Sequence, residues 1–301
     1  MKPSVVHELP TVPLTFQAHI IQARERLISA GLSKTEAALD AELLLRKLAN
    51  LDREMLLLRR HEIAGPDLVT AYRKIIRRRE LREPVHLILG VREFWGRDFK
   101  VSPHVLVPRP ETELIIETAM KASQAFSGPI HIVDAGTGSG CLAITLALEL
   151  PSVEFIATDI SSAALTVAKH NARQHNVSER IRFMQTNFLE DCNSGINLIV
   201  SNPPYIRESD RDLLPPEVRN YEPSTALFGG HDGLDCFRVL FAQAETRLLD
   251  GGWIIVEFGI DQENDIFHLA SRHKNLSFME TKQDLQGIPR IAILRKTVEV
   301  H

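Results

Sequence analysis

The 301-residue chain has few of the features that mark secreted, membrane-spanning or zinc-binding proteins. Its three cysteines, Cys141, Cys192 and Cys236, are far apart and belong to no CxxC or Cys/His cluster. We therefore expect neither disulfides nor a metal site, and we expect all three to be buried small apolar residues. No apolar run approaches the length that spans a bilayer, and MKPSVVHELP at the start has no charged segment followed by an apolar one. These absences predict a cytoplasmic protein that has no membrane partner.

An excess of positive charge is also absent. The formal net charge is -4, and the chain has 44% hydrophobic and 25% charged residues, which is ordinary globular composition. Such a balance gives no global attraction to nucleic acid. One local cluster, Arg73, Lys74, Arg77, Arg78, Arg79 and Arg82, is basic. We interpret it as a solvated helix face and do not expect nucleic acid as a partner.

The first part of the chain has a helical pattern from about Leu14 to Arg82. Apolar residues recur at spacings of three and four, which predicts helices at about 14–30, 33–49, 52–60 and 66–82. Ser33-Lys34-Thr35-Glu36 has the form of a capping box and marks the start of the second helix. We predict a small all-helical domain over residues 1–88.

Glycines and prolines interrupt this pattern between Glu83 and Pro110. The short apolar runs at 99–101 and 105–107 predict a hairpin linker over residues 89–110. From 111 to 301, strand-like and helical stretches alternate, which is typical of a doubly wound α/β domain with a mostly parallel sheet. The predicted strands are at 130–133, 154–158, 181–185, 196–200, 253–257, 276–281 and 290–295. The predicted helices are at about 111–125, 140–150, 161–175 and 237–248.

A glycine-rich turn follows the first of these strands. It consists of Gly136, Thr137, Gly138, Ser139 and Gly140, and Asp134 lies two positions before it. A dinucleotide fingerprint requires GxGxxG and a P-loop requires a lysine after its last glycine, so this GxGxG sequence matches neither. An acidic residue followed by alternate glycines suits S-adenosylmethionine. Its ammonium group can meet Asp134 while its nucleoside passes over the loop.

Polar residues end the next two strands as well. Asp159 lies where a carboxylate reaches the ribose hydroxyls of a nucleotide in such folds. Asn187 and Phe188 offer an amide and a flat apolar face to an adenine ring. Structural alternatives exist for each: Asp159 as a helix N-cap, Asn187 as a turn residue and Phe188 as a core residue.

The fourth strand leads, after one serine, into Asn202-Pro203-Pro204-Tyr205. Two prolines end strand pairing and stiffen the chain. The Asn202 amide and the neighbouring carbonyl oxygens are therefore held at fixed points beside the Tyr205 ring. This arrangement suits a planar amide or an exocyclic amine that donates its N–H bonds. The alternative interpretation is an Asx-Pro-Pro turn covered by an aromatic ring.

Taken together, these residues resemble the class I S-adenosylmethionine-dependent methyltransferases, and among them the HemK/PrmC family that methylates a glutamine of peptide-chain release factors. The resemblance covers nearly the whole chain. It includes Glu93-Phe94-Trp95-Gly96, the segment 108–113 (PRPETE), Glu222-Pro223, the segment 226–234 (ALFGGHDGL), Asp284 and the segment 287–290 (GIPR). Many relatives have Asp followed by Trp or Leu at the positions of Asn187 and Phe188.

The resemblance implies a Rossmann-like seven-stranded catalytic domain and an N-terminal helical domain that recognises the substrate. It implies that the chain is a monomer that converts S-adenosylmethionine to S-adenosylhomocysteine. The methyl group goes to the N5 amide nitrogen of a glutamine, in the GGQ motif of class I release factors. Asn202, Pro203 and Tyr205 would then be catalytic, with Pro204 also contacting substrate and Asn202 also contacting cofactor. Methylation of a nucleobase amine, or of a glutamine in a ribosomal protein, would use the same chemistry and remains an alternative.

Overall fold

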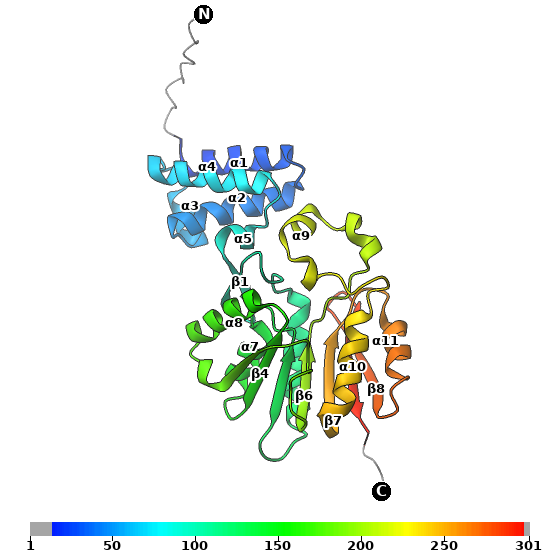
Figure 1. Cartoon of the computed structure of the whole chain (residues 1–301). Helices are drawn as coiled ribbons and strands as arrows, with labels where there is room; N and C mark the ends of the chain where they lie inside the picture. The colour runs from blue at the N-terminus through cyan, green and yellow to red at the C-terminus, as the bar shows by residue number, and fades with distance from the viewer. Residues whose placement is uncertain (1–13, 298–301) are drawn as a thin grey trace, which may run out of the picture. The chain divides into compact units, whose positions relative to one another are not determined.

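The computed structural model describes residues 14–297, and contacts divide the chain into two compact units, of which the first ends at Leu89 and the second begins at Gly90. Figure 1 shows the helices and strands of the chain. Buried apolar residues form one cluster in the N-terminal unit and two in the second unit. Within the described residues no helix combines the length and apolarity needed to cross a membrane.

The N-terminal unit consists of helices in its described part. They are α1 (Phe16–Ser29), α2 (Lys34–Ala49), α3 (Arg53–Arg59), α4 (Pro66–Glu80) and α5 (Val85–Leu89). The predicted capping box is confirmed, because the Ser33 hydroxyl accepts from the Glu36 N–H at 3.2 Å and the Glu36 carboxylate accepts from the Ser33 N–H at 3.1 Å. The first four helices match the predicted ranges to within two residues, whereas α5 was not predicted.

The basic cluster of α4 is only partly a solvated face. Arg79 is buried and donates to Asp40 at 2.7 Å. Arg77 and Arg78 are exposed, but they pair with Glu80 and Glu83 at 3.4 and 2.5 Å. Carboxylates of the same unit therefore neutralise a good part of this positive charge.

The second unit begins with a hairpin made of β1 (Val91–Phe94) and β2 (Arg97–Lys100). The predicted hairpin is confirmed there, but residues 105–107 form no strand and instead belong to a loop. Trp95 Nε1 and Arg97 donate to the Glu149 carboxylate at 3.1 and 2.7 Å, which holds the hairpin against the last residue of the helix Cys141–Glu149.

The main sheet has seven strands in the order β5-β4-β3-β6-β7-β9-β8. The first five strands in this order are parallel, and β9 runs antiparallel to both of its neighbours, β7 and β8. The predicted mostly parallel, doubly wound sheet is thus confirmed. The strands are β3 (His131–Ala135), β4 (Glu154–Asp159), β5 (Ile181–Gln185), β6 (Ile196–Ser201), β7 (Leu248–Glu257), β8 (Leu276–Gln283) and β9 (Pro289–Lys296).

Alternate residues along the strands enter two different cores. Ile132 and Leu198 face the core that contains α6 (Glu113–Ser123) and α7 (Cys141–Glu149). Their neighbours Val133 and Ile199 face the core that contains α10 (Asp235–Arg247) and α11 (Glu263–Ala270). Successive side chains of a strand point to opposite faces of the sheet, so each strand contributes to both cores. Helices cover both faces, which is why these strands are apolar at nearly every position.

Three elements of this unit differ from the sequence-based prediction. The short helix α9 (Pro216–Tyr221) and the helix α11 were not predicted. Strand β7 starts at Leu248, five residues before the predicted start, because Leu248 pairs with Ile196 across a register shift that contains Gly251 and Gly252.

Helix α8 (Ser162–Gln174) lies in its predicted range and follows β4.

The strand order reverses between β3 and β6. From β3 the chain adds β4 and then β5 on one side, and it then returns to place β6 on the other side of β3. Ligands of open α/β sheets bind at the carboxyl ends of the strands beside such a reversal. The residues that follow β3, β4, β5 and β6 are therefore brought to one edge of the sheet.

Candidate active site

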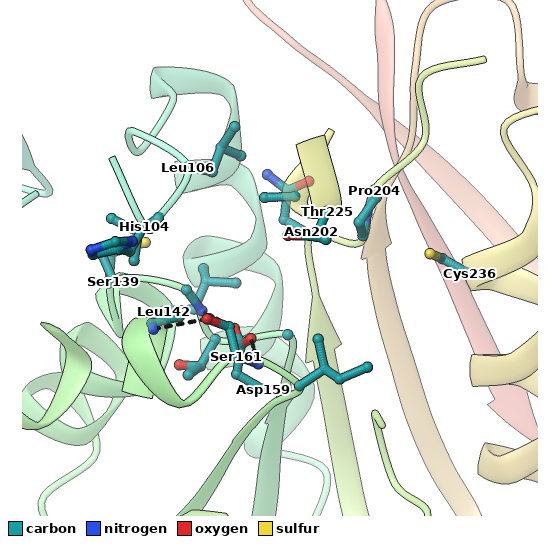
Figure 2. Close-up of a pocket in the computed structure, with 18 of the residues that line it drawn as sticks. His104, Leu106, Ser139, Leu142, Asp159, Ser161, Asn202, Pro204, Thr225 and Cys236 are labelled. Atoms are coloured by element: carbon teal, nitrogen blue, oxygen red, sulfur yellow. Dashed lines mark hydrogen bonds between the residues drawn. The ribbon is translucent and has the colours of Figure 1, made fainter. Parts of the chain in front are cut away.

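A cavity of about 360 Å³ lies at this edge of the sheet (Figure 2). Nine of the predicted site residues line it: Gly136, Thr137, Gly138, Ser139, Asp159, Asn187, Phe188, Asn202 and Pro204. In Figure 2, Asn202 and Pro204 lie together on one side of the cavity, and Ser139 and Asp159 lie on the other. Asp134, Gly140, Pro203 and Tyr205 are not part of its lining.

The glycine loop is shaped by backbone conformation. Gly136, Gly138 and Gly140 have φ of +80, +55 and +82°, a region that L side chains rarely adopt. A Cβ on Gly138 would meet no atom within 4 Å, so the loop leaves open space there. A Cβ on Gly140 would lie 2.8 Å from Ile144 Cδ1, so this third glycine allows close packing and does not itself face the cavity.

Asp134 lies beneath the loop and is fully buried. Its Oδ2 accepts from the Thr137 hydroxyl at 2.6 Å and from the Ala143 N–H at 3.1 Å. Its Oδ1 is buried without a hydrogen-bond partner among the described residues. Burial raises the pKa of Asp134 to about 7, against the opposing effect of these two hydrogen bonds. Asp134 thus ties the loop to the start of α7 and keeps one acceptor free.

Asp159 bridges the loop and the start of α8. Its Oδ2 accepts from the Gly138 N–H at 2.9 Å and its Oδ1 accepts from the Ser161 N–H at 2.8 Å. The N-cap of α8 is Ser161, whose hydroxyl accepts from the Ala164 N–H at 3.1 Å. The alternative interpretation of Asp159 as this helix's N-cap is therefore wrong. Burial raises its pKa.

Asn187 and Phe188 follow β5 and line the cavity. Phe188 has φ of +52°, and one ring atom lies 3.8 Å from the position of a Cβ on Gly136. Gln243 of α10 holds this turn, because its Oε1 accepts from the Leu189 N–H at 2.7 Å and its Nε2 donates to the Asn187 carbonyl at 3.3 Å. The sequence pattern gave no signal for Gln243, which lies more than fifty residues further along the chain.

A second cavity, of about 170 Å³, adjoins the end of β6. Asn202, Pro203 and Tyr205 line it. Asn202 also lines the first cavity, so its side chain belongs to the walls of both. The Asn202 Nδ2 donates to the Thr112 hydroxyl at 3.1 Å, whereas its Oδ1 is buried and has no hydrogen-bond partner in the described part of the chain.

The glycines of the 226–234 segment pack against the backbone of the tetrapeptide. A Cβ on Gly229 would lie 2.5 Å from the Pro204 carbonyl oxygen, and a Cβ on Gly233 would lie 2.3 Å from the Tyr205 carbonyl oxygen. Gln262 donates from Nε2 to the same Tyr205 oxygen at 3.0 Å. These contacts fix the path of residues 202–205, which the two prolines alone would not do.

An ion pair joins two segments beside the second cavity. Arg109 Nη2 donates to both carboxylate oxygens of Glu222 at 2.7 Å, and Glu222 is buried. Burial raises the pKa of Glu222, although Arg109 opposes this. The segments 108–113 and 222–223, which the sequence singled out only by family resemblance, are therefore in direct contact.

The cysteines are not all buried as predicted. Cys141 and Cys192 are buried, but Cys236 is half-buried and lines the first cavity together with Cys141. Within residues 14–297, no group of three or more His, Cys, Asp or Glu side chains is arranged to hold a metal ion.

Comparison with known proteins gives two family matches. Residues 111–214 match the methyltransferase small domain, and residues 19–90 match the PrmC N-terminal domain. A release factor glutamine methyltransferase from Nitratidesulfovibrio vulgaris is 37% identical over 94% of this chain and 96% of its own length. One from Geobacter sulfurreducens is 39% identical over 85% of this chain and 88% of its own length.

The fold has solved counterparts. The catalytic domain of human Mettl16, determined in complex with an RNA hairpin, matches with a TM-score of 0.55 and 17% identity, over 73% of this chain and 82% of that one. At this identity the likeness concerns the fold alone.

Proposed function

This chain belongs to the release factor glutamine methyltransferase family, and on that premise we propose that it transfers a methyl group from S-adenosylmethionine to the N5 amide nitrogen of a glutamine, in the GGQ motif of class I peptide-chain release factors. The reaction leaves S-adenosylhomocysteine. The protein acts as a monomer in the cytoplasm, where release factors work.

The observation that carries the proposal is the position of Asn202 between two cavities. The larger cavity has the glycine loop, Asp159 and Phe188 in its walls, which suits a methyl donor that carries a nucleoside. The smaller cavity suits the target side chain. An unpartnered, buried Asn202 Oδ1 at their shared wall is an acceptor for an N–H bond that the protein itself does not supply.

The residues present fit S-adenosylmethionine. The free space over Gly138 admits a ligand close to the backbone, and Phe188 offers an apolar ring beside Gly136. Asp159 carries two oxygens that can each accept further hydrogen bonds from ribose hydroxyls. Asp134, with one unpartnered oxygen beneath the loop, suits the ammonium group.

When bound, the cofactor supplies an electrophilic methyl group on a sulfonium ion. The protein's part is to make a poor nucleophile react, since an amide lone pair is delocalised into the carbonyl group. As nitrogen bonds to carbon and the carbon–sulfur bond breaks, the nitrogen gains positive charge and its N–H bonds become more acidic. The Asn202 Oδ1 and the Pro203 carbonyl oxygen accept those N–H bonds and stabilise the transition state more than the ground state.

Tyr205 completes the smaller cavity and holds the planar amide in line with the methyl group. Pro204 lines the larger cavity. No general base is needed in this scheme, because the proton leaves to solvent after transfer, when it is acidic. We further propose that residues 1–88 recognise the release factor, that 89–110 link the two parts, and that 111–301 carry the chemistry.

The test is a transfer assay with labelled S-adenosylmethionine and three separate acceptors: a class I release factor, DNA, and ribosomal proteins. We expect label on the release factor. Label on DNA alone, or on ribosomal proteins alone, would replace the proposal with one of the two alternatives.

Two variants locate the site in the same assay. Asn202→Ala is expected to lower kcat by about 10²- to 10³-fold, as for loss of other transition-state hydrogen bonds, while it keeps most of the affinity for S-adenosylhomocysteine. Asp159→Ala is expected mainly to weaken that affinity. Wild-type turnover by Asn202→Ala would show that Asn202 has no catalytic role.

A further inference from the structure

At the shared wall of the two cavities, four side chains form one hydrogen-bonded chain. Thr112 and Asn202 line the larger cavity, Asn202 and Tyr205 line the smaller one, and Glu257 lines neither. Asn202 Nδ2 donates to the Thr112 hydroxyl at 3.1 Å, and this hydroxyl donates to Glu257 Oε2 at 2.6 Å. The Tyr205 hydroxyl donates to Glu257 Oε1 at 3.2 Å. Thr112 is 3% exposed and Glu257 is 2% exposed, so water does not compete for these groups.

The direction of this chain follows from counting hydrogens. A threonine hydroxyl has one hydrogen to donate, and a carboxylate can only accept. Because Thr112 gives its hydrogen to Glu257, its oxygen can only accept from Asn202. The amide nitrogen of Asn202 must then face Thr112, and the amide oxygen is left on the opposite side.

The other end of the chain fixes the carboxylate itself. Glu257 receives one hydrogen from Thr112 on one oxygen and one from Tyr205 on the other. Burial raises the pKa of Glu257, and the nearby Glu111 carboxylate adds to this, whereas the two hydroxyl donors and the Arg290 guanidinium oppose it. The two hydrogen-bond donors favour the ionised, acceptor-only form on which the direction of the chain depends, although the net shift of the pKa is upward.

The two ends of an asparagine amide differ little in shape, and their orientation is decided by their partners. If the chain ran in the opposite direction, the Thr112 hydroxyl would donate to the Asn202 oxygen. The Asn202 NH₂ group would then face the N–H bonds of the target amide. Two donors would meet, and the acceptor for the developing charge would be lost.

We propose that Thr112 and Glu257 are positioning residues, which orient the Asn202 side-chain amide so that its Oδ1 faces the nitrogen to be methylated. This inference rests on the proposed function and adds to it. Neither residue need touch the reacting atoms. Thr112 acts through Asn202, and Glu257 acts through Thr112.

The test compares Thr112→Val with Thr112→Ser in the full chain. Valine has the shape of threonine but can neither accept from Asn202 nor donate to Glu257, whereas serine keeps the hydroxyl. We expect Thr112→Val to lower kcat by about 10- to 100-fold, in the range for a misdirected transition-state hydrogen bond. We expect Thr112→Ser to restore most of the rate. Calorimetric affinity for S-adenosylhomocysteine and the KM for the release factor should stay close to the wild-type values in both.

Thr118→Val is the matched control. Thr118 is a buried threonine of α6, the helix for which Thr112 is the N-cap residue, and its hydroxyl donates only to the Leu114 carbonyl oxygen at 2.7 Å. The same chemical change there should leave kcat unchanged. A fall in kcat equal to that of Thr112→Val would mean that general loosening of the helix explains both results, and would overturn the inference.

Glu257→Gln is a second, independent variant, and the inference can be tested with it alone if Thr112→Val does not fold. Glutamine offers one acceptor and one donor where the wild type offers two acceptors, so one of the two hydroxyls must reverse. A fall in kcat with unchanged S-adenosylhomocysteine affinity supports the inference. Wild-type kcat in both Thr112→Val and Glu257→Gln contradicts it. If the wild-type protein itself labels no release factor, the proposed function fails instead, which is a separate outcome.

Discussion

Two side chains, Asp134 and Asn202, each keep one buried oxygen without a hydrogen-bond partner in residues 14–297. Leaving a buried acceptor unsatisfied costs roughly 1–3 kcal/mol. Their other polar atoms are satisfied by Thr137, Ala143 and Thr112. In a folded protein such acceptors call for an explanation. At this site the explanation is a ligand that brings its own donors.

Asp134 should leave a signature in the pH dependence of stability. Its pKa rises from 3.8 to about 7 on folding, mainly because burial penalises the charge. Between these values the folded state binds more protons than the unfolded state, so the free energy of unfolding falls as pH rises from about 4 to about 7. This stabilisation is fully present below the unfolded pKa and is lost above the folded one.

We expect Asp134→Asn to flatten that slope by an amount on the order of a few kcal/mol across the interval. The measurement is urea unfolding at several pH values without cofactor. Asp191→Asn, at an exposed position of the same unit, is the control. An unchanged slope in Asp134→Asn would show that this carboxyl does not gain a proton on folding.

At the scale of elements, the 226–234 segment holds the reactive tetrapeptide by backbone contact. Gly233 has φ of +78°, and a Cβ there would lie 2.3 Å from the Tyr205 carbonyl oxygen. We expect Gly233→Ala to displace residues 202–205 and to lower kcat by roughly 10-fold or more, since small misplacements of reacting groups are costly.

Gly195→Ala separates this displacement from backbone strain. Gly195 also has a positive φ, +101°, but a Cβ there would meet no atom within 4 Å. It precedes β6 at the end of the strand away from Asn202. The control should lose about 1 kcal/mol of stability and keep its kcat. Equal kcat in both variants would contradict the assigned role of Gly233.

The elements that could be predicted from sequence are those with a local cause. The capping box at Ser33 and the glycine loop after β3 can each be recognised from a few consecutive residues. Strand β7 was predicted too short because Gly251 and Gly252 look like a turn, whereas they lie in a register shift opposite β6. The short helix α9 has too few turns to show a period.

The residues of the site also fall into those that could be predicted from the sequence and those that could not. Residues that follow a strand were predictable as neighbours, because parallel strands deliver their ends to one edge of the sheet. Glu257, Gln243 and Gln262 were not, since each acts on a residue more than fifty positions away. Only the folded chain shows that Thr112 lies against Asn202.

At the scale of the whole molecule, the two units are proposed to divide recognition and chemistry. The helical unit exposes several large apolar side chains, among them Leu57 (61% exposed) and Leu58 (77% exposed) of α3. Exposed apolar groups of this size contribute strongly where a partner covers them. They are candidates for contact with a release factor.

We expect the double variant Leu57→Ser, Leu58→Ser to raise the KM for an intact release factor by roughly 10-fold, the cost of about 1.4 kcal/mol of binding. The rate with a short GGQ-containing peptide should not change, because a peptide reaches only the catalytic unit. Leu249→Ser, an exposed position at the start of β7, is the control. An unchanged KM in the double variant would exclude this surface from recognition.

The most direct test of the account is to map the methyl group on the product. A class I release factor is incubated with S-adenosylmethionine and the wild-type protein, and its peptides are analysed by tandem mass spectrometry. The account predicts one added methyl group on the side chain of the GGQ glutamine, none when that glutamine is replaced by asparagine, and far less in the same reaction time when Asn202→Ala is used. Methylation elsewhere on the release factor, or undiminished methylation by Asn202→Ala, would contradict it.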